Sequence, residues 1–144
     1  MNAERGEARR ELERRIDAVE AGYEFLLAYA AQGRERDRGA GGGRLREFLE
    51  GMRGALAGLG ALVAALMEQD DAGSARAGGA FLAALEKDAA TAQAAVSLVL
   101  SREDIGSQLI DNLNASIHLR ALLTDLFLVD ELLKSRASRE RPED

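Results

Sequence analysis

The chain contains no cysteine, no tryptophan, one proline and one histidine, and aromatic residues make up 4% of its 144 residues. The absence of cysteine excludes disulfides, thiolate metal sites and thiol catalysis. With a single histidine and no HExxH spacing, we predict no metal site, no other cofactor and no catalytic residues. The one proline stands at position 142, so the body of the chain favours long helices.

Length and composition indicate one globular domain. Hydrophobic residues account for 47% and charged residues for 31% of the chain, which is typical of a folded protein. Much of the apolar share is alanine and glycine, so the core has to gain density from close approach of backbones. We predict a helical domain over residues 1–135 and a flexible charged tail over residues 136–144.

The charge distribution bears on partners and location. A net charge of −6 at pH 7 disfavours nucleic acid as a partner. The charged N-terminal stretch MNAERGEARRELERR lacks the apolar core of a signal peptide, and the uncharged run Gly54–Met67 is shorter than a bilayer span. We therefore expect a soluble, cytoplasmic protein that does not use a membrane as partner.

Apolar residues recur in steps of three and four in four segments, which predicts an all-α fold. The most regular series contains Leu45, Leu49, Met52, Leu56, Leu59, Val63 and Leu66. Short connections favour antiparallel neighbours. We predict an up-down antiparallel four-helix bundle with helices near 3–32, 44–70, 75–100 and 102–135. The connection over residues 34–43 is rich in charge and glycine, so we expect it to open locally at little cost.

The fourth segment is apolar around much of its circumference, which predicts that a second subunit covers part of it. We expect a homo-oligomer through this helix, most simply a two-fold dimer. Phe25 and Tyr29 of the first segment lie off its main apolar row, so we expect them to be exposed, which also favours a subunit contact. The candidate interface residues are Phe25, Tyr29, Leu122, Leu128, Val129 and Leu132.

Small residues form a second row on the 44–70 segment, about 100° around from the leucine row. The favoured interpretation is close packing against a neighbouring helix, which would offset the cost of interior glycine. The alternative is a surface groove or a subunit contact. The row consists of Gly51, Gly54, Gly58, Ala61 and Ala65.

A polar row on the fourth segment contains the single histidine. Asp111, His118 and Asp125 are spaced by seven residues, with Asn114 beside them. The favoured interpretation is an outer polar stripe in which the polar groups of the histidine are satisfied by a bonding partner. The alternative is a reactive histidine, as in phosphotransfer proteins.

The residues after His118 resemble the phosphoacceptor box of dimeric histidine kinases, usually written H-E-L-R-x-P-L-T. Leu119, Arg120, Leu123 and Thr124 match that pattern, and Leu122 stands in place of its proline. In this register Ile117 stands where the acceptor histidine belongs, and His118 occupies the position of the glutamate. The resemblance implies a phosphotransfer role only if His118 itself is the acceptor.

The first segment is similar to the first helix of the all-helical chorismate mutases, where Leu-Arg-x-x-Ile-Asp is typical. Leu12, Ile16 and Asp17 fit, but Glu13 replaces the arginine that would bind a substrate carboxylate. A dianionic substrate requires several converging cations. We therefore do not expect this activity.

These observations predict a non-enzymatic, self-associating helical bundle that acts as an accessory or protein-interaction protein. One alternative is a histidine phosphotransfer-like signalling protein that uses His118. Another is a small-molecule binder or enzyme with a pocket in the bundle core.

Overall fold

The computed structural model describes residues 2–38, 42–68 and 75–140, and this part of the chain contains helices and loops but no strand. The predicted all-α class is confirmed. The helices are α1 (Asn2–Ala30), α2 (Gly42–Leu56), α3 (Leu59–Glu68), α4 (Ala75–Leu100), α5 (Ser107–Ala115) and α6 (Ile117–Glu140).

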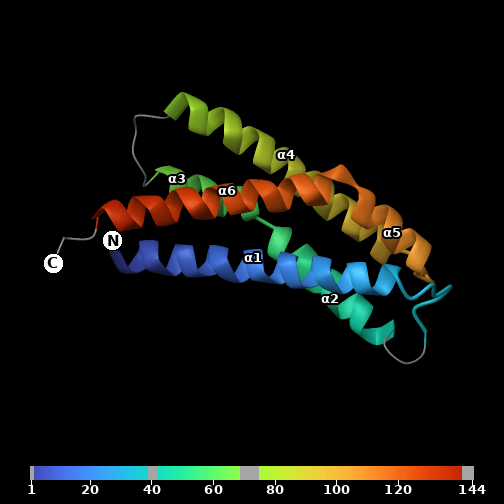
Figure 1. The fold of residues 1–144 in the computed structure, drawn as a ribbon. Helices are drawn as coiled ribbons and strands as arrows, with labels where there is room; N and C mark the ends of the chain where they lie inside the picture. Colours follow the sequence, from blue (N-terminus) through green and yellow to red (C-terminus); the bar gives the residue numbers. More distant parts are fainter. Residues whose placement is uncertain (1, 39–41, 69–74, 141–144) are drawn as a thin grey trace.

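The helices lie side by side in an elongated bundle (Figure 1). α1 runs along the molecule and packs against α2, α3, α5 and α6. α4 packs against α2, α3 and α6, and it runs antiparallel to α6 (Figure 1). The connection from α1 to α2 and the connection from α4 to α5 meet at the same end of the bundle (Figure 1).

The leucine row of the second segment lies in the core, as its periodicity predicts. All seven of its residues are buried, and they pack with apolar residues of the other helices, among them Leu12, Val19 and Leu26 of α1. The helices also approach closely where side chains are small. A Cβ atom at Gly22 of α1 would overlap the Met52 side chain of α2, so this crossing depends on glycine.

The predicted continuous helix over residues 44–70 is wrong, because the chain breaks between α2 and α3. Gly58 adopts a φ of 70°, in the left-handed region that favours glycine. Arg15 of α1 donates hydrogen bonds to the carbonyl oxygens of Ala55 and Ala57, which the break leaves without helical partners. The leucine row gives no sign of the break because Leu56 and Leu59 are buried on either side of it.

The predicted helix over residues 102–135 is also divided. The chain leaves α4 in a turn and stays non-helical until Ser107, and the backbone of Ser116 is extended (φ −60°, ψ 124°) between α5 and α6. The peptide N–H of Ile105 bonds to Asp37 in the other loop, which holds this segment out of a helix. At the other end, α6 continues to Glu140, so residues 136–140 of the predicted tail have a helical backbone, and residues 141–144 lie outside the described part of the chain.

Residues Gly43–Glu68 are long and apolar enough to cross a membrane by length and composition alone. In the bundle, however, the same residues form two helices whose leucine row is buried in the protein core. The core helices of soluble proteins satisfy the same criterion.

Candidate functional site

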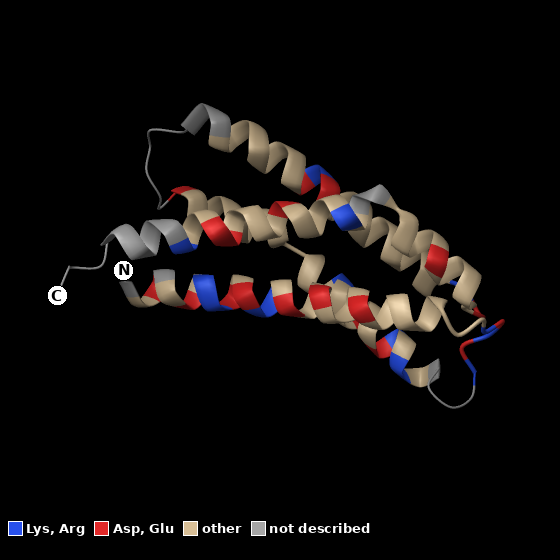
Figure 2. Ribbon diagram, viewed as in Figure 1, with Lys and Arg blue, Asp and Glu red and all other residues tan. Residues whose placement is uncertain are grey.

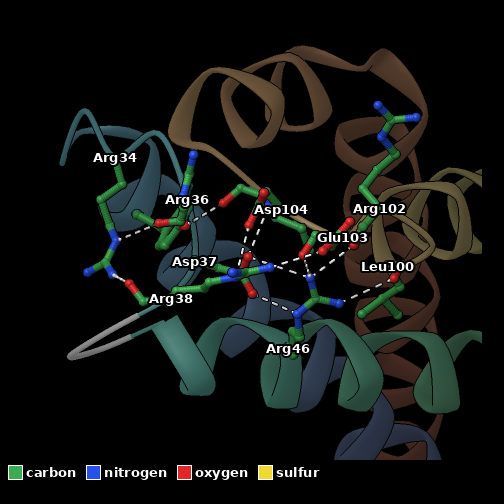
Figure 3. A network of polar contacts seen from close by, with 11 residues as sticks. Arg34, Arg36, Asp37, Arg38, Arg46, Leu100, Arg102, Glu103 and Asp104 are labelled. Carbon is green, nitrogen blue, oxygen red and sulfur yellow. Dashed lines mark hydrogen bonds and ion pairs between the residues drawn. The ribbon is translucent and has the colours of Figure 1, made fainter.

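The end of the bundle where the two long connections meet is held by a group of polar contacts, which we call the loop clamp: Tyr29, Arg34, Asp37, Arg46, Ile105 and Ser107. Figure 3 shows Arg34, Asp37 and Arg46 of this group. At its centre, Asp37 is buried with 8% of its surface exposed. Arg46 Nε donates to Asp37 Oδ2 over 2.6 Å, and the peptide N–H of Ile105 donates to Oδ1 over 2.9 Å. One carboxylate therefore joins the first connection to α2 and to the second connection.

The guanidinium of Arg46 extends this connection through its remaining N–H groups. It donates to the carbonyl oxygens of Arg102 and Glu103, each over 2.9 Å, and of Leu100 over 3.4 Å (Figure 3). Burial raises the pKa of the Asp37 carboxyl, but the hydrogen bonds from Arg46 and Ile105 outweigh burial and hold that pKa below its usual value. Asp37 is thus an ionised structural group at neutral pH.

A second set of clamp contacts joins α1 directly to the start of α5. Tyr29 Oη donates to the carbonyl oxygen of Ile105 over 2.6 Å, and Ser107 Oγ donates to the carbonyl oxygen of Tyr29 over 2.7 Å. Arg34 and Ser107 are bonded twice, from the Arg34 N–H to Ser107 Oγ over 2.8 Å and from the Ser107 N–H to the Arg34 carbonyl over 2.7 Å. Gly106 fits between them because a Cβ atom there would lie 2.9 Å from the Glu35 carbonyl oxygen.

These contacts show that the connection over residues 34–43, which was expected to open locally at little cost, contributes a buried group to the fold. Asp37 is buried, and Arg34 bonds to the carbonyl oxygens of Arg36 and Arg38 within the loop. Residues 39–41 lie outside the described part of the chain. Because these bonds run between the two connections and from both of them to α1 and α2, the arrangement holds the two loops together.

A second polar contact lies between α4 and α6, where Asp88 faces Asp125; we call these residues the acid pair. Burial raises the pKa of the Asp125 carboxyl to about 6, and a hydrogen bond with Asp88 and the like charge of Asp88 act in the same direction. Asp125 Oδ2 is buried and has no hydrogen-bond partner among the described residues. Among the described residues, therefore, no cation acts on Asp125 as Arg46 acts on Asp37.

The predicted polar row does not form one continuous helical face, because α5 ends before Ser116 and α6 begins after it. Asp111 is exposed. Asn114 is 5% exposed, and neither its amide oxygen nor its amide nitrogen has a partner in the described part of the protein. The side chain of His118 lies outside the described residues. Asp125 alone of the predicted row is placed in a titratable contact.

The predicted oligomer interface is divided between core and surface. Tyr29, Leu122 and Val129 are buried within the protein, so the expectation that Tyr29 lies on the surface is wrong. Phe25 stacks on Phe48 of α2, with ring centroids 4.3 Å apart. The other two predicted residues, Leu128 and Leu132, are 48% and 51% exposed on α6, and Phe127 beside them is 46% exposed.

The predicted small-residue row faces outwards. Gly51, Gly54 and Gly58 are exposed, and a Cβ atom at any of them would meet no other atom within 4 Å. Ala61 and Ala65 are exposed on α3. Close packing of this row against another helix of the same chain is therefore not what the structure has, and the row remains part of the outer surface.

A surface depression of about 550 Å³ lies beside the loop clamp and is lined by the two loops and the start of α5. It includes the exposed side chain of Asp111, whereas the core of the bundle is filled by apolar residues. Among the residues that the structure describes, no three His, Asp or Glu side chains are arranged to hold a metal ion.

The sequence reasoning did not identify the two polar contacts that the fold creates. Asp37 lies in a charged, glycine-rich stretch without periodicity, so nothing near it in the sequence indicates burial. Asp88 and Asp125 each precede a core residue, Ala89 and Leu126. That position beside the core was a usable signal for partial burial, but it did not indicate that the two carboxyl groups meet.

No protein-family model matches this sequence, and comparisons with curated proteins and with solved structures find no match either.

Proposed function

We propose that this protein is a non-enzymatic, self-associating helical bundle that acts as an accessory or protein-interaction protein. In this proposal four antiparallel arms, α1, α2–α3, α4 and α5–α6, form an up-down bundle that pairs with a second copy through α6. The observation that carries the proposal is the group of half-exposed large apolar side chains on α6, Phe127, Leu128 and Leu132, which we call the α6 apolar face.

The α6 apolar face supports association because its side chains are large and close together. Leu128 and Leu132 are four residues apart, so they lie on the same side of the helix, one turn from each other. Contiguous apolar surface of this kind on a folded protein is typical of an interaction site. In a two-fold pairing the same residues of two copies meet, so the α6 apolar face of each copy covers that of the other.

The polar contacts support a non-enzymatic role. Arg46 and Asp37 of the loop clamp form a close ion pair of 2.6 Å, and the hydroxyl groups of Tyr29 and Ser107 bond to backbone groups. The acid pair is two like groups with no third polar side chain acting on Asp125 among the described residues. Neither contact combines a nucleophile, a base and a group that would stabilise developing charge.

The oligomeric state in solution tests this proposal. We expect light scattering on a sizing column to give at least the mass of a dimer at micromolar concentration. Leu128→Glu and Leu132→Glu should each shift the protein towards monomer while the helical circular dichroism is retained, because a buried charge opposes pairing. Leu98→Glu is the matched control: Leu98 is 69% exposed on α4, and we expect its substitution to leave the mass unchanged. A wild-type monomer at these concentrations, or a dimer unaffected by both α6 substitutions, would contradict the proposal.

A further inference from the structure

The break between α2 and α3 interrupts a segment whose sequence favours one helix. The leucine row keeps its steps of three and four from Leu45 to Leu66, and no proline stands between them. In the structure α2 and α3 follow one another at an angle (Figure 1). Gly58 at the break has a φ of 70°, and glycine adopts such a φ about as readily as a helical one. The local sequence is therefore compatible with a bent form and with a straight form.

The bent form gives up backbone hydrogen bonds. A continuous helix would join the N–H groups of residues 58–61 to the carbonyl oxygens of residues 54–57. Within the described residues 42–68 none of these four bonds is present. The last helical bond before the break runs from the Ala57 N–H to the Arg53 carbonyl, and the next one runs from the Leu62 N–H to the Gly58 carbonyl, each over 3.2 Å.

A side chain of α1 compensates part of this loss. Arg15 Nη1 donates to the carbonyl oxygen of Ala57 and, over 3.4 Å, to that of Ala55. Arg15 Nε donates to Glu11 Oε1 over 2.9 Å, which fixes the direction of the guanidinium. Hydrogen bonds from a charged donor are stronger than those between neutral groups. Arg15 thus bonds two of the four carbonyl oxygens that the bend releases.

The straight form is not obstructed at the break itself. Ala57 and Gly58 are exposed, and a Cβ atom at Gly58 would meet no other atom within 4 Å. What favours the bent form, besides Arg15, is the packing of α3 against α1 and α4, in which Leu59, Val63 and Leu66 are buried. The choice between the two forms therefore sets Arg15 and this packing against four backbone bonds.

We propose that α2 and α3 form a two-state segment, which is bent when Arg15 bonds to the break and becomes one continuous helix when Arg15 is released. This inference goes beyond the proposed function and does not depend on self-association. In the straight form α3 leaves its place against α1 and α4, and its buried apolar residues become accessible. Arg15 is the positioning residue of the bent form, which predominates in the unmodified protein.

Two substitutions should shift the segment towards the straight form. Gly58→Ala opposes the left-handed φ and favours a helix, so we expect the ratio of straight to bent form to rise by roughly 30-fold or more. Arg15→Met keeps a long apolar stem but has no donor, so we expect a rise of about tenfold. Amide hydrogen exchange, followed by NMR, should slow at the N–H groups of residues 59–61 in both variants, because the straight helix bonds them.

A distance between spin labels reports the movement of α3. The chain has no cysteine, so Glu13→Cys on α1 and Ala65→Cys on α3, both at exposed positions, introduce the only thiols. We expect a second, longer distance to appear when Gly58→Ala or Arg15→Met is added. Ala28→Cys with Glu47→Cys, on α1 and α2, is the control pair and should keep one distance. An excess of unlabelled protein removes distances between copies.

Matched variants separate the bonds at the break from general effects. Arg14 bonds to Glu11 but not to the break, so Arg14→Met should leave exchange and distance unchanged. Gly51→Ala, at an exposed glycine inside α2, should also leave both unchanged.

Three results would overturn the inference. The first is unchanged exchange and distance in both Gly58→Ala and Arg15→Met. The second is a longer distance without slower exchange at residues 59–61, because α3 would then detach without continuing α2. The third is an equal effect of Arg14→Met, which would assign the change to the charge of α1. If Gly58→Ala fails to fold, Arg15→Met decides, since it leaves the residues of the break unaltered.

Discussion

Two aspartates in different regions of this bundle respond to burial in opposite ways. Asp37, in the loop clamp, is buried and has a pKa below the ordinary value, whereas Asp125, in the acid pair, is partly buried and has a pKa raised to about 6. The difference lies in what surrounds each carboxyl group. Asp37 receives hydrogen bonds from the Arg46 guanidinium and from a peptide N–H, while Asp125 faces another carboxyl group.

The comparison teaches that partners, and not burial alone, decide whether a buried carboxylate stabilises this fold. Both groups lose hydration, which raises the pKa of each. Compensation by a cation makes Asp37 a fixed connection between two loops. Among the described residues no cation acts on Asp125, so burial and the neighbouring Asp88 raise its pKa. Charges of both signs lie along the first half of α1, whereas α3 and most of α4 carry few charges (Figure 2).

The largest effect should follow removal of the central carboxylate of the loop clamp. Asp37→Ala leaves Arg46 and the Ile105 N–H without their shared acceptor, and we expect it to lower the free energy of unfolding by about 3 kcal/mol. Urea denaturation measures the change. Limited trypsin digestion should then cut sooner at Arg34, Arg36 or Arg38. Unchanged stability together with an unchanged cleavage rate would show that the clamp does not hold the loops.

A smaller loss should follow from crowding the place where the two loops touch. In Gly106→Ala the new methyl group would lie 2.9 Å from the Glu35 carbonyl oxygen and 3.2 Å from that of Arg34. The loop backbone has to move, which weakens the bond between Ser107 and Arg34, and we expect a loss of about 2 kcal/mol. Gly51→Ala is the matched control, because its Cβ meets open space on a helix, and it should be neutral or slightly stabilising. Equal effects of the two substitutions would argue against a tight loop contact.

Removing a single hydroxyl from the clamp should cost less again. Tyr29→Phe loses the hydrogen bond to the Ile105 carbonyl, which is buried, but keeps the packed ring. We expect a loss of about 1 kcal/mol, measured by urea denaturation. Tyr23→Phe is a control on the same helix, since Tyr23 is only partly buried and no hydrogen bond of its hydroxyl to another described residue is present.

The smallest effect should be the change of the free energy of unfolding with pH, to which the two aspartates contribute with opposite sign. Raising the pH from 5 to 7 should lower the free energy of unfolding by about 1 kcal/mol or less through Asp125, because solvent screens a partly exposed group. Asp37, with its lowered pKa, contributes stability that is present above about pH 3.8 and is lost as the pH falls through its folded value. Asp125→Asn should flatten the first slope and leave the acid-side loss in place. Loss of both slopes in that variant would mean that the two groups are not independent.

How much could be predicted depends on how far apart the contacting residues are in the sequence. The leucine row of α2 and α3 was predicted correctly because neighbouring turns of a helix share one face, and that is a local property. The break between those helices was missed because the apolar spacing continues across Gly58, where φ is left-handed and Arg15 of another helix bonds to the carbonyl oxygens of Ala55 and Ala57. The apolar spacing along one segment does not indicate that a hydrogen-bond donor comes from a distant part of the sequence.

The candidate residues divide in the same way. The half-exposed Leu128 and Leu132 agree with the expectation that α6 has apolar residues on more than one side. The expectation for Tyr29 failed because its position off the main apolar row of α1 indicates exposure, whereas the second connection folds over its hydroxyl. Residues that lie off the main row are exposed or buried according to which segment packs above them.

By itself, the sequence determined the helical class of this protein, the leucine row that faces its core and an excess of apolar side chains on α6. These properties follow from spacing along one helix, where 3.6 residues per turn fix which side chains share a face. Only the tertiary structure decided that Asp37 meets Arg46 and that Asp125 meets Asp88. The reason is electrostatic and non-local: the pKa of a buried carboxyl depends on groups within a few ångströms, and packing brings those groups from distant parts of the chain.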